Sequence, residues 1–458
     1  MLILGAGPAG ATAARLLGGW GQRVHLVAKP PGPGKLAVSL PPSCIKLFDA
    51  CGVTAAIDRA GFIRSTGNTV WWGTDQPRVE FFQGGVRGWQ ADLQQFSDVL
   101  REQATSDLIR VTASVAPELI ADAALVLDCT GRAGVIAKEH GVREYDAGPR
   151  TVGLVGEWRT GASWSLPDDT HTIIESYRDG WMWSVPTAPG VRHVSAMIDP
   201  QRSELARGGS PRGVYLNEIG KTGQFKQLLG DARLTGGPWG WDATPYRSRE
   251  YAGANWILVG DAASFIDPLS SAGVQKALAS AWLAAIVANT CVSRPMRRSD
   301  ALAFFAARER QVEARYSSAA RLFLTAAARE HREAFWADRV VEIEHGADAT
   351  AAVQAAFERL KAAPELRVRV SPDITISPRP YIDGHEIAIG DHIVSGDRDS
   401  GTRYLHNVNV PALIELAPRV TTVEELLTAY LARCGAVDLH DFLMGLSTVI
   451  ARRWLVSE

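Results

Sequence analysis

The spacing of apolar and polar residues divides the chain into segments with different periods. At the N-terminus the apolar run LIL is followed by the glycine-rich turn GAGPAG, the alanine-rich segment ATAARLL and a second apolar run, RVHLVAK. This order predicts a strand, a tight turn, a helix and a second strand, the opening βαβ unit of a parallel sheet. Leu93, Phe96 and Leu100 are spaced by three and four residues and predict a helix over GWQADLQQFSDVLREQA. The run AALVLDCTGRAG predicts a buried strand that ends in a turn.

Residues 151–245 form a strand-rich segment in which Thr, Trp and Val are frequent. Within it, the run GWMWSVPTAPG places Trp181 and Trp183 on one face of a strand and Met182 on the other. Two large aromatic side chains on one face border the same space, which is either a sheet-helix contact or a pocket. The apolar run NWILVGDAASF then resumes the α/β pattern, so we expect a β-rich substrate domain inserted within an α/β domain of residues 1–295.

Helical and strand-like periods follow one another in the last third of the chain. Residues 296–360 carry a long Ala, Arg and Glu-rich pattern that predicts a brace of one or two long helices. Residues 366–458 predict a small α+β domain, because RVRVSPDITISPRP and HEIAIGDHI alternate like strands and helices follow at Thr421 and Asp438. Thr421 and Glu424 have the spacing of a capping box. One face of the last helix carries Phe442, Leu446, Val449 and Ile450.

Composition narrows the possible partners. The chain has 458 residues, of which 46% are hydrophobic and 21% charged, which is enough for two or three domains with full cores. A formal net charge of −2 argues against binding to nucleic acid or to an anionic membrane, because both need a basic excess. The five cysteines are scattered without a C-x-x-C pair, so we expect neither a disulfide framework nor a metal site, and a cytoplasmic protein. The beginning of the chain lacks the basic region of a signal peptide, and the uncharged run ALASAWLAAIVANTCVS predicts a buried helix.

The first turn carries a phosphate-binding motif. The segment GAGPAG contains Gly5, Gly7, Pro8, Ala9 and Gly10, directly after a predicted strand and before a predicted helix. In this context the first glycine permits the tight turn, the second lets the backbone approach a pyrophosphate, and the third lets helix and strand pack closely. The motif alone also occurs in other glycine-rich turns, and two further motifs decide the cofactor.

Two further motifs are VLDCTGRAG and ILVGDAASFIDPLSSAGVQKAL. They resemble, in order and spacing, the second and third flavin motifs of FAD-dependent monooxygenases. The resemblance implies FAD as the cofactor, with Asp261 bonded to ribityl or ribose hydroxyls and a loop from Pro268 to Val274 that presents N–H groups to the flavin pyrimidine. A helix that begins near Gly273 would place its positive end where reduced flavin carries negative charge. The residues implied by the second motif are Asp128, Thr130, Gly131 and Arg132. Those implied by the third are Gly260, Asp261, Pro268, Ser271, Ala272, Gly273 and Val274.

One position departs from the dinucleotide-binding pattern. An acidic residue is expected at the end of the second strand, where it would hold the adenosine ribose. The chain has Ala28 followed by Lys29 there. We therefore expect that another residue holds the ribose or that FAD binds loosely.

Three stretches within residues 1–340 resemble flavin-dependent halogenases and their monooxygenase relatives. FIDPLSSAG matches the pattern F-x-x-P-x-x-S-x-G, WMWSVP matches W-x-W-x-I-P, and AVSLPPSCIK is similar to the family stretch GESLPPS. Ala37 and Val38 replace the usual Gly and Glu, and Lys46 falls where the resemblance puts the catalytic lysine of tryptophan halogenases. The resemblance also implies that Trp181 and Trp183 belong to the sheet that separates flavin from substrate.

Two chemistries follow from this resemblance. In both, reduced FAD reacts with O₂ to form a C4a-hydroperoxide in a pocket that excludes water. A monooxygenase transfers the distal oxygen to an electron-rich ring, whereas a halogenase forms hypohalous acid that travels to a lysine beside the substrate. The chain contains one dinucleotide motif, so an external reductant is expected, either a separate flavin reductase or NAD(P)H. The proton acceptor has no clear candidate, because structural or exposed positions are expected for His25, His385, His392, His406 and His440.

The C-terminal domain bears on the substrate. Its sequence from VNVPALIELAPRVTTVEELL onward resembles the winged-helix-like peptide-binding domains related to the pyrroloquinoline-quinone biosynthesis chaperone, which capture leader peptides by strand addition. An accessory domain that covers the core or forms a dimer is the other interpretation. Together with the flavin motifs, the domain makes the chain similar to the peptidyl-tryptophan hydroxylases of tryptophylquinone biogenesis, which serve quinohemoprotein amine dehydrogenase.

The resulting hypothesis is an FAD-dependent monooxygenase that hydroxylates a tryptophan residue in a peptide or small protein before quinone formation. Its expected partners are that substrate, a maturation enzyme and a flavin reductase. One alternative is a halogenase of tryptophan or another small aromatic compound. Another is a flavin-binding scaffold without turnover that recruits a partner enzyme.

Overall fold

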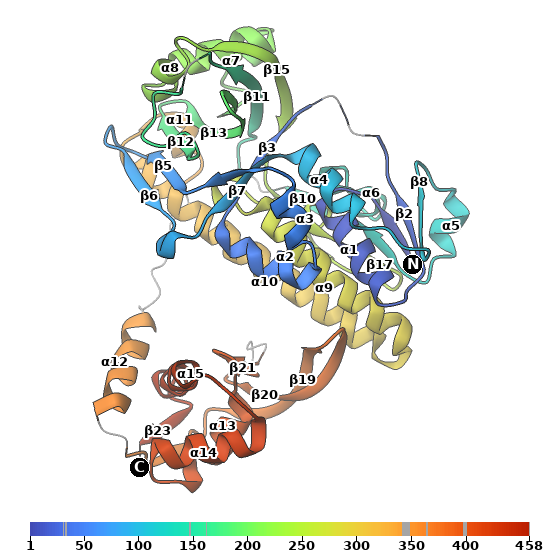
Figure 1. Cartoon of the computed structure of the whole chain (residues 1–458), viewed down its shortest axis with the longest axis vertical. Helices are drawn as coiled ribbons and strands as arrows, with labels where there is room; N and C mark the ends of the chain where they lie inside the picture. Colours follow the sequence, from blue (N-terminus) through green and yellow to red (C-terminus); the bar gives the residue numbers. More distant parts are fainter. Residues whose placement is uncertain are drawn as a thin grey trace. The chain divides into compact units, whose positions relative to one another are not determined.

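The chain folds into two compact units. The computed structural model describes residues 1–30, 32, 34–145, 148–161, 163–340, 349–362, 365–396 and 401–457. The units comprise residues 1–343 and 344–458 (Figure 1). The predicted helical brace of residues 296–360 is divided between the two units, and its residues 341–348 lie outside the described residues.

A parallel sheet forms the base of the first unit. Its five strands lie in the order β17-β9-β1-β2-β8, and all pair in parallel. The strands and the two helices that pack together on the sheet are β1 (Leu2–Leu4), α1 (Pro8–Gly19), β2 (Val24–Val27), β8 (Ile109–Thr112), β9 (Val126–Asp128), β17 (Trp256–Leu258) and α9 (Gly273–Ser293). This confirms the predicted βαβ unit. Helix α9 is long and apolar enough to cross a membrane, but 72% of its most apolar window is buried within the protein.

A seven-stranded sheet forms the second layer of this unit. Its order is β15-β11-β14-β13-β12-β5-β6, and only β12 and β5 are parallel neighbours. The strands are β5 (Gly67–Trp71), β6 (Arg78–Phe81), β11 (Val152–Arg159), β12 (Thr172–Tyr177), β13 (Gly180–Ala188), β14 (Val191–Ile198) and β15 (Arg233–Asp242). Because β5 and β6 precede residue 151, the sheet is larger than the predicted insertion.

Helices cover both faces of this sheet. The face that carries Met182 packs with Val194 and Tyr215 beneath α7 (Pro211–Gly220) and α8 (Gln224–Leu228). The face that carries Trp181 packs against the end of α10 (Arg298–Ala328) and α11 (Ala334–Ala337), where Trp336 is fully buried. Figure 1 shows α7, α8 and the green strands β11 and β15 together at one end of this unit.

A small three-stranded sheet joins these layers. It consists of β3 (Ala37–Leu40), β7 (Gly88–Asp92) and β4 (Ile63–Ser65), with β7 in the centre. The prediction of a helix from Gly88 is therefore wrong at its start, because Gly88–Asp92 pairs with both neighbours as a strand. Asp92 caps the helix α4 (Leu93–Glu102) that follows, accepting hydrogen bonds from the backbone N–H groups of Gln94 and Gln95.

Shorter elements complete the first unit. They are η1 (Pro42–Cys44), α2 (Ile45–Cys51), α3 (Thr54–Arg59), η2 (Gln83–Gly85), α5 (Pro117–Ala121), η3 (Gly131–Ala133), α6 (Val135–Glu139), β10 (Arg143–Tyr145), η4 (Glu204–Arg207), β16 (Tyr246–Ser248), η5 (Gly260–Ala262), η6 (Pro268–Ser270) and η7 (Pro295–Arg297). The pair β10 and β16 is antiparallel.

The second unit combines short strands with helices, as predicted. Its elements are α12 (Ala349–Ala362), β18 (Val368–Val370), β19 (Thr375–Asp383), β20 (Glu386–Val394), β21 (Tyr404–Leu405), β22 (Val408–Asn409), α13 (Val410–Leu416), η8 (Ala417–Arg419), α14 (Val423–Cys434), α15 (Leu439–Ala451) and β23 (Leu455–Ser457). Asp438 caps α15, as expected. The predicted capping box is one residue early, because Thr422 caps α14 and the Glu425 carboxylate accepts from the backbone N–H of Thr421.

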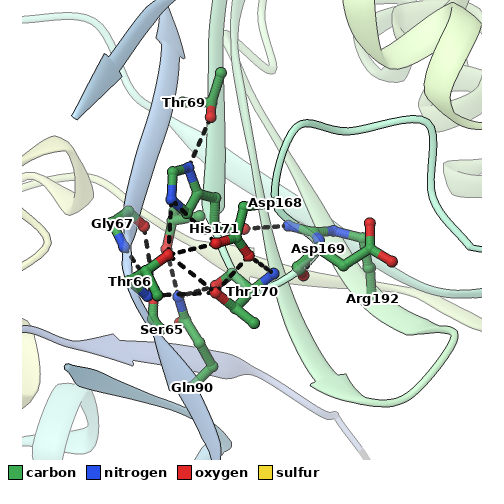
Figure 2. Close-up of polar contacts among 11 residues, drawn as sticks. Ser65, Thr66, Gly67, Thr69, Gln90, Asp168, Asp169, Thr170, His171 and Arg192 are labelled. Carbon is green, nitrogen blue, oxygen red and sulfur yellow. Dashed lines mark hydrogen bonds and ion pairs between the residues drawn. The ribbon is translucent and has the colours of Figure 1, made fainter. Parts of the chain in front are cut away.

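A buried polar cluster holds the start of β12 against β5 (Figure 2). The Thr66 hydroxyl donates to Asp168 at 2.5 Å, so its oxygen accepts from His171 Nε2 at 3.0 Å. The other ring nitrogen, Nδ1, then accepts from the Thr69 hydroxyl at 2.9 Å. His171 is fully buried and neutral in this arrangement. The Arg192 guanidinium donates to the His171 carbonyl oxygen and is itself fully buried.

The cluster also reaches the small sheet. Gln90 Nε2 donates to the Thr172 hydroxyl at 2.9 Å, and that hydroxyl donates to Ser39 Oγ at 3.0 Å. Since Ser39 belongs to β3, the cluster fixes β3 relative to the seven-stranded sheet.

The cluster predicts acid sensitivity of the fold. Burial lowers the pKa of His171 below its usual 6.5 in the folded state, so protonation favours the unfolded chain. The stabilisation that neutral His171 contributes is complete above pH 6.5, the pKa of histidine in the unfolded chain. It is lost as the pH falls through the lowered pKa of the folded state. A shift of one pKa unit corresponds to about 1.4 kcal/mol.

Urea unfolding of the wild type and of His171→Gln between pH 8 and pH 5 measures this contribution. We expect the free energy of unfolding to fall less steeply with acidification in His171→Gln. The matched variant His140→Gln changes an exposed imidazole of the same unit and should keep the wild-type slope. Equal slopes in the wild type and His171→Gln would contradict the prediction.

Candidate functional site

Three cavities lie in a row along the ends of the parallel strands. Their volumes are about 430, 300 and 140 Å³. The first and second share Gly5, Gly7 and Thr130 in their walls. The second and third share Leu93, Asp261, Gly273 and Val274. The shared walls join the predicted pyrophosphate turn to the loop of the third flavin motif.

The three glycines of the first motif have different surroundings. Gly5 has φ +95°, and an added Cβ would lie 2.5 Å from the carbonyl oxygen of Cys129. A Cβ on Gly10 would lie 1.8 Å from the carbonyl oxygen of Gly5, so α1 packs directly on the turn. Beside Gly7 there is nothing within 4 Å. The space left at Gly7, at the N-terminus of α1, suits a pyrophosphate that approaches the backbone. Pro8 and Ala9 line the same cavity.

The residues of the second motif divide between the cavity wall and its support. Thr130 and Gly131 line the second cavity. Asp128 is fully buried, where its carboxylate accepts from the Thr130 N–H and hydroxyl and from the N–H of Ile136. The Arg132 guanidinium lies over the Phe265 ring at 4.0 Å. The side chains of Asp128 and Arg132 therefore support the turn that forms the cavity wall. That they contact the cofactor remains a prediction.

The third motif forms the wall between the second and third cavities. Asp261 borders both, and its Oδ1 atom is buried without a hydrogen-bond partner in the described part of the chain. The helix predicted near Gly273 is α9, which begins at that residue. Gly260 and Ala272 are buried. Of the predicted loop residues, the third cavity is lined by Pro268, Ser271, Gly273 and Val274.

The adenosine end of the row contains basic and amide side chains. Lys29 lines the first cavity next to Val27, at the end of β2, where an acid was expected. Helix α4 contributes Gln94, Ser97 and Arg101 to the same wall. These α4 side chains are the polar groups available to an adenosine ribose in place of the missing carboxylate.

Two tryptophans border the third cavity. Trp183 and Trp241 line it, and each has an indole N–H that is buried without a partner among the described residues. Trp181, predicted as a second wall residue, lies deeper, at 2% exposure. Its ring contacts Trp183 and Trp72 in the core beneath α10 and α11. Trp183 thus belongs both to this aromatic core and to the wall of the third cavity.

Lys46 occupies a different place. It lies on α2 and is exposed to solvent. It is absent from the walls of the three cavities. Its predicted catalytic role stays a prediction that this geometry does not support.

No protein-family model matches the chain. Tryptophan 2-halogenase of Chondromyces crocatus is 26% identical over 334 residues, which cover 67% of this chain and 64% of that enzyme. The chain therefore spans just under two thirds of this relative's length.

Among solved structures, the flavin-dependent halogenase CmlS superposes with a TM-score of 0.80 at 19% identity, covering 99% of this chain and 95% of CmlS. The peptidyl tryptophan dihydroxylase QhpG, essential for tryptophylquinone cofactor biogenesis, superposes with a TM-score of 0.66 at 22% identity, covering 99% and 97%. The sequence is similar to a flavin-dependent halogenase, and the fold is that of flavin-dependent halogenases and of a tryptophan dihydroxylase, which supports a place in the flavin-dependent halogenase and monooxygenase superfamily. The α/β fold with a sheet-rich layer and long helices that the motifs predicted is confirmed.

The residues present fit the FAD that this superfamily uses. The open space at Gly7 accommodates a pyrophosphate, and the Asp261 carboxylate, which borders the second and third cavities with its side chain 30% exposed, can accept a hydrogen bond from a sugar or ribityl hydroxyl. The N-terminal N–H groups of α9 face the third cavity through Gly273 and Val274, as a flavin pyrimidine requires.

Sequence reasoning missed two charged residues beneath this site. Lys276 is 2% exposed in α9, and Glu309 is 2% exposed in α10. A signal for Lys276 was present, because it is the one charged residue in the apolar segment that forms α9. Glu309 lies in a segment rich in charge, so its burial depends on tertiary packing.

The close approach at Gly10 predicts a sharp difference between two glycines of α1. Gly10→Ala should abolish FAD binding, because its methyl group would overlap the Gly5 carbonyl oxygen. Gly19→Ala in the same helix meets nothing within 4 Å and should bind FAD normally, with a stability gain of up to about 1 kcal/mol. Fluorescence titration of the apoproteins with FAD, paired with thermal unfolding, measures both effects. Retention of wild-type affinity in Gly10→Ala would refute the assignment of this turn.

Proposed function

We propose that the protein is an FAD-dependent monooxygenase that hydroxylates a tryptophan side chain within a peptide or small protein. The flavin fold supports the cofactor, and the likeness to QhpG over almost the whole of both chains supports the substrate class. The tryptophan would approach the flavin at the third cavity, where Trp183 and Trp241 line the wall with aromatic rings.

The position of Lys46 is the observation that favours hydroxylation over halogenation. The resemblance puts the catalytic lysine of tryptophan halogenases at Lys46, and this residue is exposed on α2, outside the walls of the three cavities. The third cavity is lined by apolar, aromatic and hydroxyl-bearing side chains with Asp261 and Asp267. Such a wall supports direct transfer of oxygen to a ring and offers no amine in the described residues that line it.

The cavity residues have separate tasks in this proposal. Bound FAD, once reduced, activates O₂ and supplies the oxygen atom. The N-terminus of α9 stabilises negative charge at the pyrimidine end of the cavity. Trp183 and Trp241 exclude water and orient the ring of the substrate. Burial raises the pKa of Asp267 to about 6, so this carboxyl in the cavity wall can accept or release a proton near neutral pH.

The second unit would capture the peptide, and its hairpin restricts where. In β19, Pro378 pairs with Asp391 and Pro380 pairs with Ile389 of β20. Because proline has no N–H, both nitrogens occupy positions that point away from β20, so the outer edge of β19 lacks two donors. The paired Ile389 points its backbone N–H away from β19, and its side chain is 41% exposed. We therefore place the added strand along the β20 edge near Ile389.

Halogenation is the second candidate. The curated relative from Chondromyces crocatus is a tryptophan halogenase, and CmlS superposes with the higher TM-score. In this alternative the substrate is tryptophan or another small aromatic compound. A flavin-binding scaffold without turnover that recruits a partner enzyme is a third candidate.

Further partners follow from the same proposal. A flavin reductase or NAD(P)H would reduce the FAD, and a maturation enzyme would take the hydroxylated peptide onward to the quinone. The five cysteines are free thiols, four of them buried, which suits a reducing compartment, and we propose the cytoplasm.

The reaction is tested by intact-mass analysis of tryptophan-containing peptides encoded beside the gene. The peptide is incubated with the protein, FAD, a reductant and O₂, in chloride or in bromide. We expect mass gains in steps of one oxygen that do not depend on the halide. A gain that differs between chloride and bromide would establish a halogenase, and no gain with any candidate substrate would favour the scaffold.

Lys46→Ala provides the internal check on this choice. Because Lys46 is exposed on α2, the variant should form product within about twofold of the wild type, as surface substitutions usually do. Loss of product with normal flavin oxidation would show that Lys46 has a catalytic role.

Peptide capture is tested with two proline substitutions in the hairpin. Ile389→Pro removes an outward N–H from the β20 edge and should weaken binding of the same peptide about tenfold. Ile376→Pro removes an outward N–H from the β19 edge, two residues before Pro378, and should leave the affinity unchanged. Fluorescence anisotropy with a labelled peptide on the full chain measures both. Equal effects of the two variants would rule out strand addition at β20.

A further inference from the structure

The single charge of α9 is buried directly behind the cofactor cavity. Lys276 lies one turn into the helix, and its side chain is 0% exposed. Its ammonium donates to the carbonyl oxygens of Gly260 at 2.9 Å and Ser264 at 2.6 Å. The same nitrogen lies 3.8 Å from Asp261 Oδ1. The lysine therefore spans the turn that carries the cavity-lining carboxylate.

Two carboxylates surround this ammonium. Asp261 borders the cavity, and Glu309 of α10 interacts electrostatically with Lys276, is 2% exposed and has one carboxylate oxygen unpaired among the described residues. Ser280 connects Glu309 to the turn that carries Asp261, because its hydroxyl bonds to Glu309 and accepts from the Gly260 N–H at 2.9 Å. A buried ammonium is costly unless counter-charges and hydrogen-bond acceptors surround it. Both conditions are met here, by Asp261 and Glu309 and by the carbonyl oxygens of Gly260 and Ser264.

We propose that Lys276 is a positioning residue for the cofactor. It keeps Asp261 ionised and turned toward the cavity, and it adds a fixed positive charge behind the flavin. The inference rests on the FAD site of the proposed function, and it assigns a role to a residue outside the flavin motifs.

The first part of the role follows from the charges around Asp261. Its Oδ1 atom is buried without a hydrogen bond, so a neutral surrounding would favour the protonated acid. Burial raises the pKa of Asp261, and the nearby ammonium of Lys276 opposes this rise, as do Arg132 and Arg143. An ionised Asp261 accepts hydrogen bonds from two hydroxyls, whereas the protonated acid would also present a donor toward them. Loss of Lys276 should therefore weaken FAD binding through Asp261.

The second part concerns the oxidation state of the flavin. Lys276 follows Gly273 and Val274, whose backbone borders the third cavity, by two to three residues. A fixed ammonium at this end of the helix adds to the helix dipole. Since reduced flavin carries negative charge, the lysine should strengthen binding of reduced FAD more than binding of oxidised FAD.

The experiment compares three single variants of the full chain. Lys276→Met keeps the length of the side chain and removes its charge, and Lys276→Arg keeps the charge. Gln275→Met is the matched control, because it makes a similar change on the same helical turn at a residue outside the cavity walls. Fluorescence titration gives the Kd for oxidised FAD, and anaerobic titration gives the Kd for reduced FAD. Circular dichroism and thermal unfolding verify that each variant folds.

We expect Lys276→Met to weaken oxidised FAD about tenfold and reduced FAD about a hundredfold, with a more negative midpoint potential in a dye-equilibration assay. Lys276→Arg should recover most of the affinity, and Gln275→Met should match the wild type. Wild-type affinity for both forms in Lys276→Met would overturn the inference while leaving the FAD site intact. Failure of the wild type itself to bind FAD would overturn both.

A double variant separates a positioning role from general destabilisation. In Asp261→Asn the carboxylate is already neutral, so adding Lys276→Met should weaken oxidised FAD by clearly less than it does in the wild-type background. If Lys276→Met folds poorly, Lys276→Gln, which keeps a donor for the carbonyl oxygens of Gly260 and Ser264, replaces it in both backgrounds. Equal losses in the two backgrounds would show that Lys276 does not act through Asp261, and would overturn the inference.

Discussion

The contact between Gly10 and the Gly5 carbonyl oxygen is the constraint on which the site depends. An added Cβ on Gly10 would lie 1.8 Å from that oxygen, so helix and turn are as close as two backbones can be. This contact aims the N-terminus of α1 at the first two cavities and brings α1 against α9. Helix α9 then places its own N-terminus at the third cavity. Two helix N-termini therefore face one row of cavities, and both favour an anionic ligand.

The seven-stranded sheet supplies the other half of the site. Because side chains alternate along β13, Met182 lies on the face beneath α7 and α8, and Trp181 and Trp183 lie on the opposite face. On that face the aromatic core ends at Trp183, which is both a core residue and a cavity wall. The polar cluster around His171 then holds β3 in place through Gln90, Thr172 and Ser39, and Ser39 also lines the third cavity. The rigidity of the cavity thus comes from both layers.

The local parts of this architecture could be predicted from the sequence, because short-range physics determines them. The glycine turn, the start of α9 at Gly273 and the cap at Asp438 depend on neighbouring residues and occur as expected. The strand Gly88–Asp92 was taken for a helix, because the helical spacing of Leu93, Phe96 and Leu100 continues into α4 and hides the change of period. The membership of β5 and β6 in the large sheet depends on pairing across more than a hundred residues, as in Val70 with Ile174, which no local pattern reveals.

The surroundings of the side chains in the site could be predicted even less well from local sequence patterns. A motif identifies Asp261 but does not show which charged groups surround this half-buried carboxylate. That depends on Lys276, fifteen residues later, and on Glu309 from another helix, which meet only after α9 and α10 pack together. For Lys46 the motif gives a position along the chain but not the direction of the side chain, and α2 turns it toward solvent. A motif thus gives the position of a residue along the chain, and the packing of the fold determines which way its side chain points.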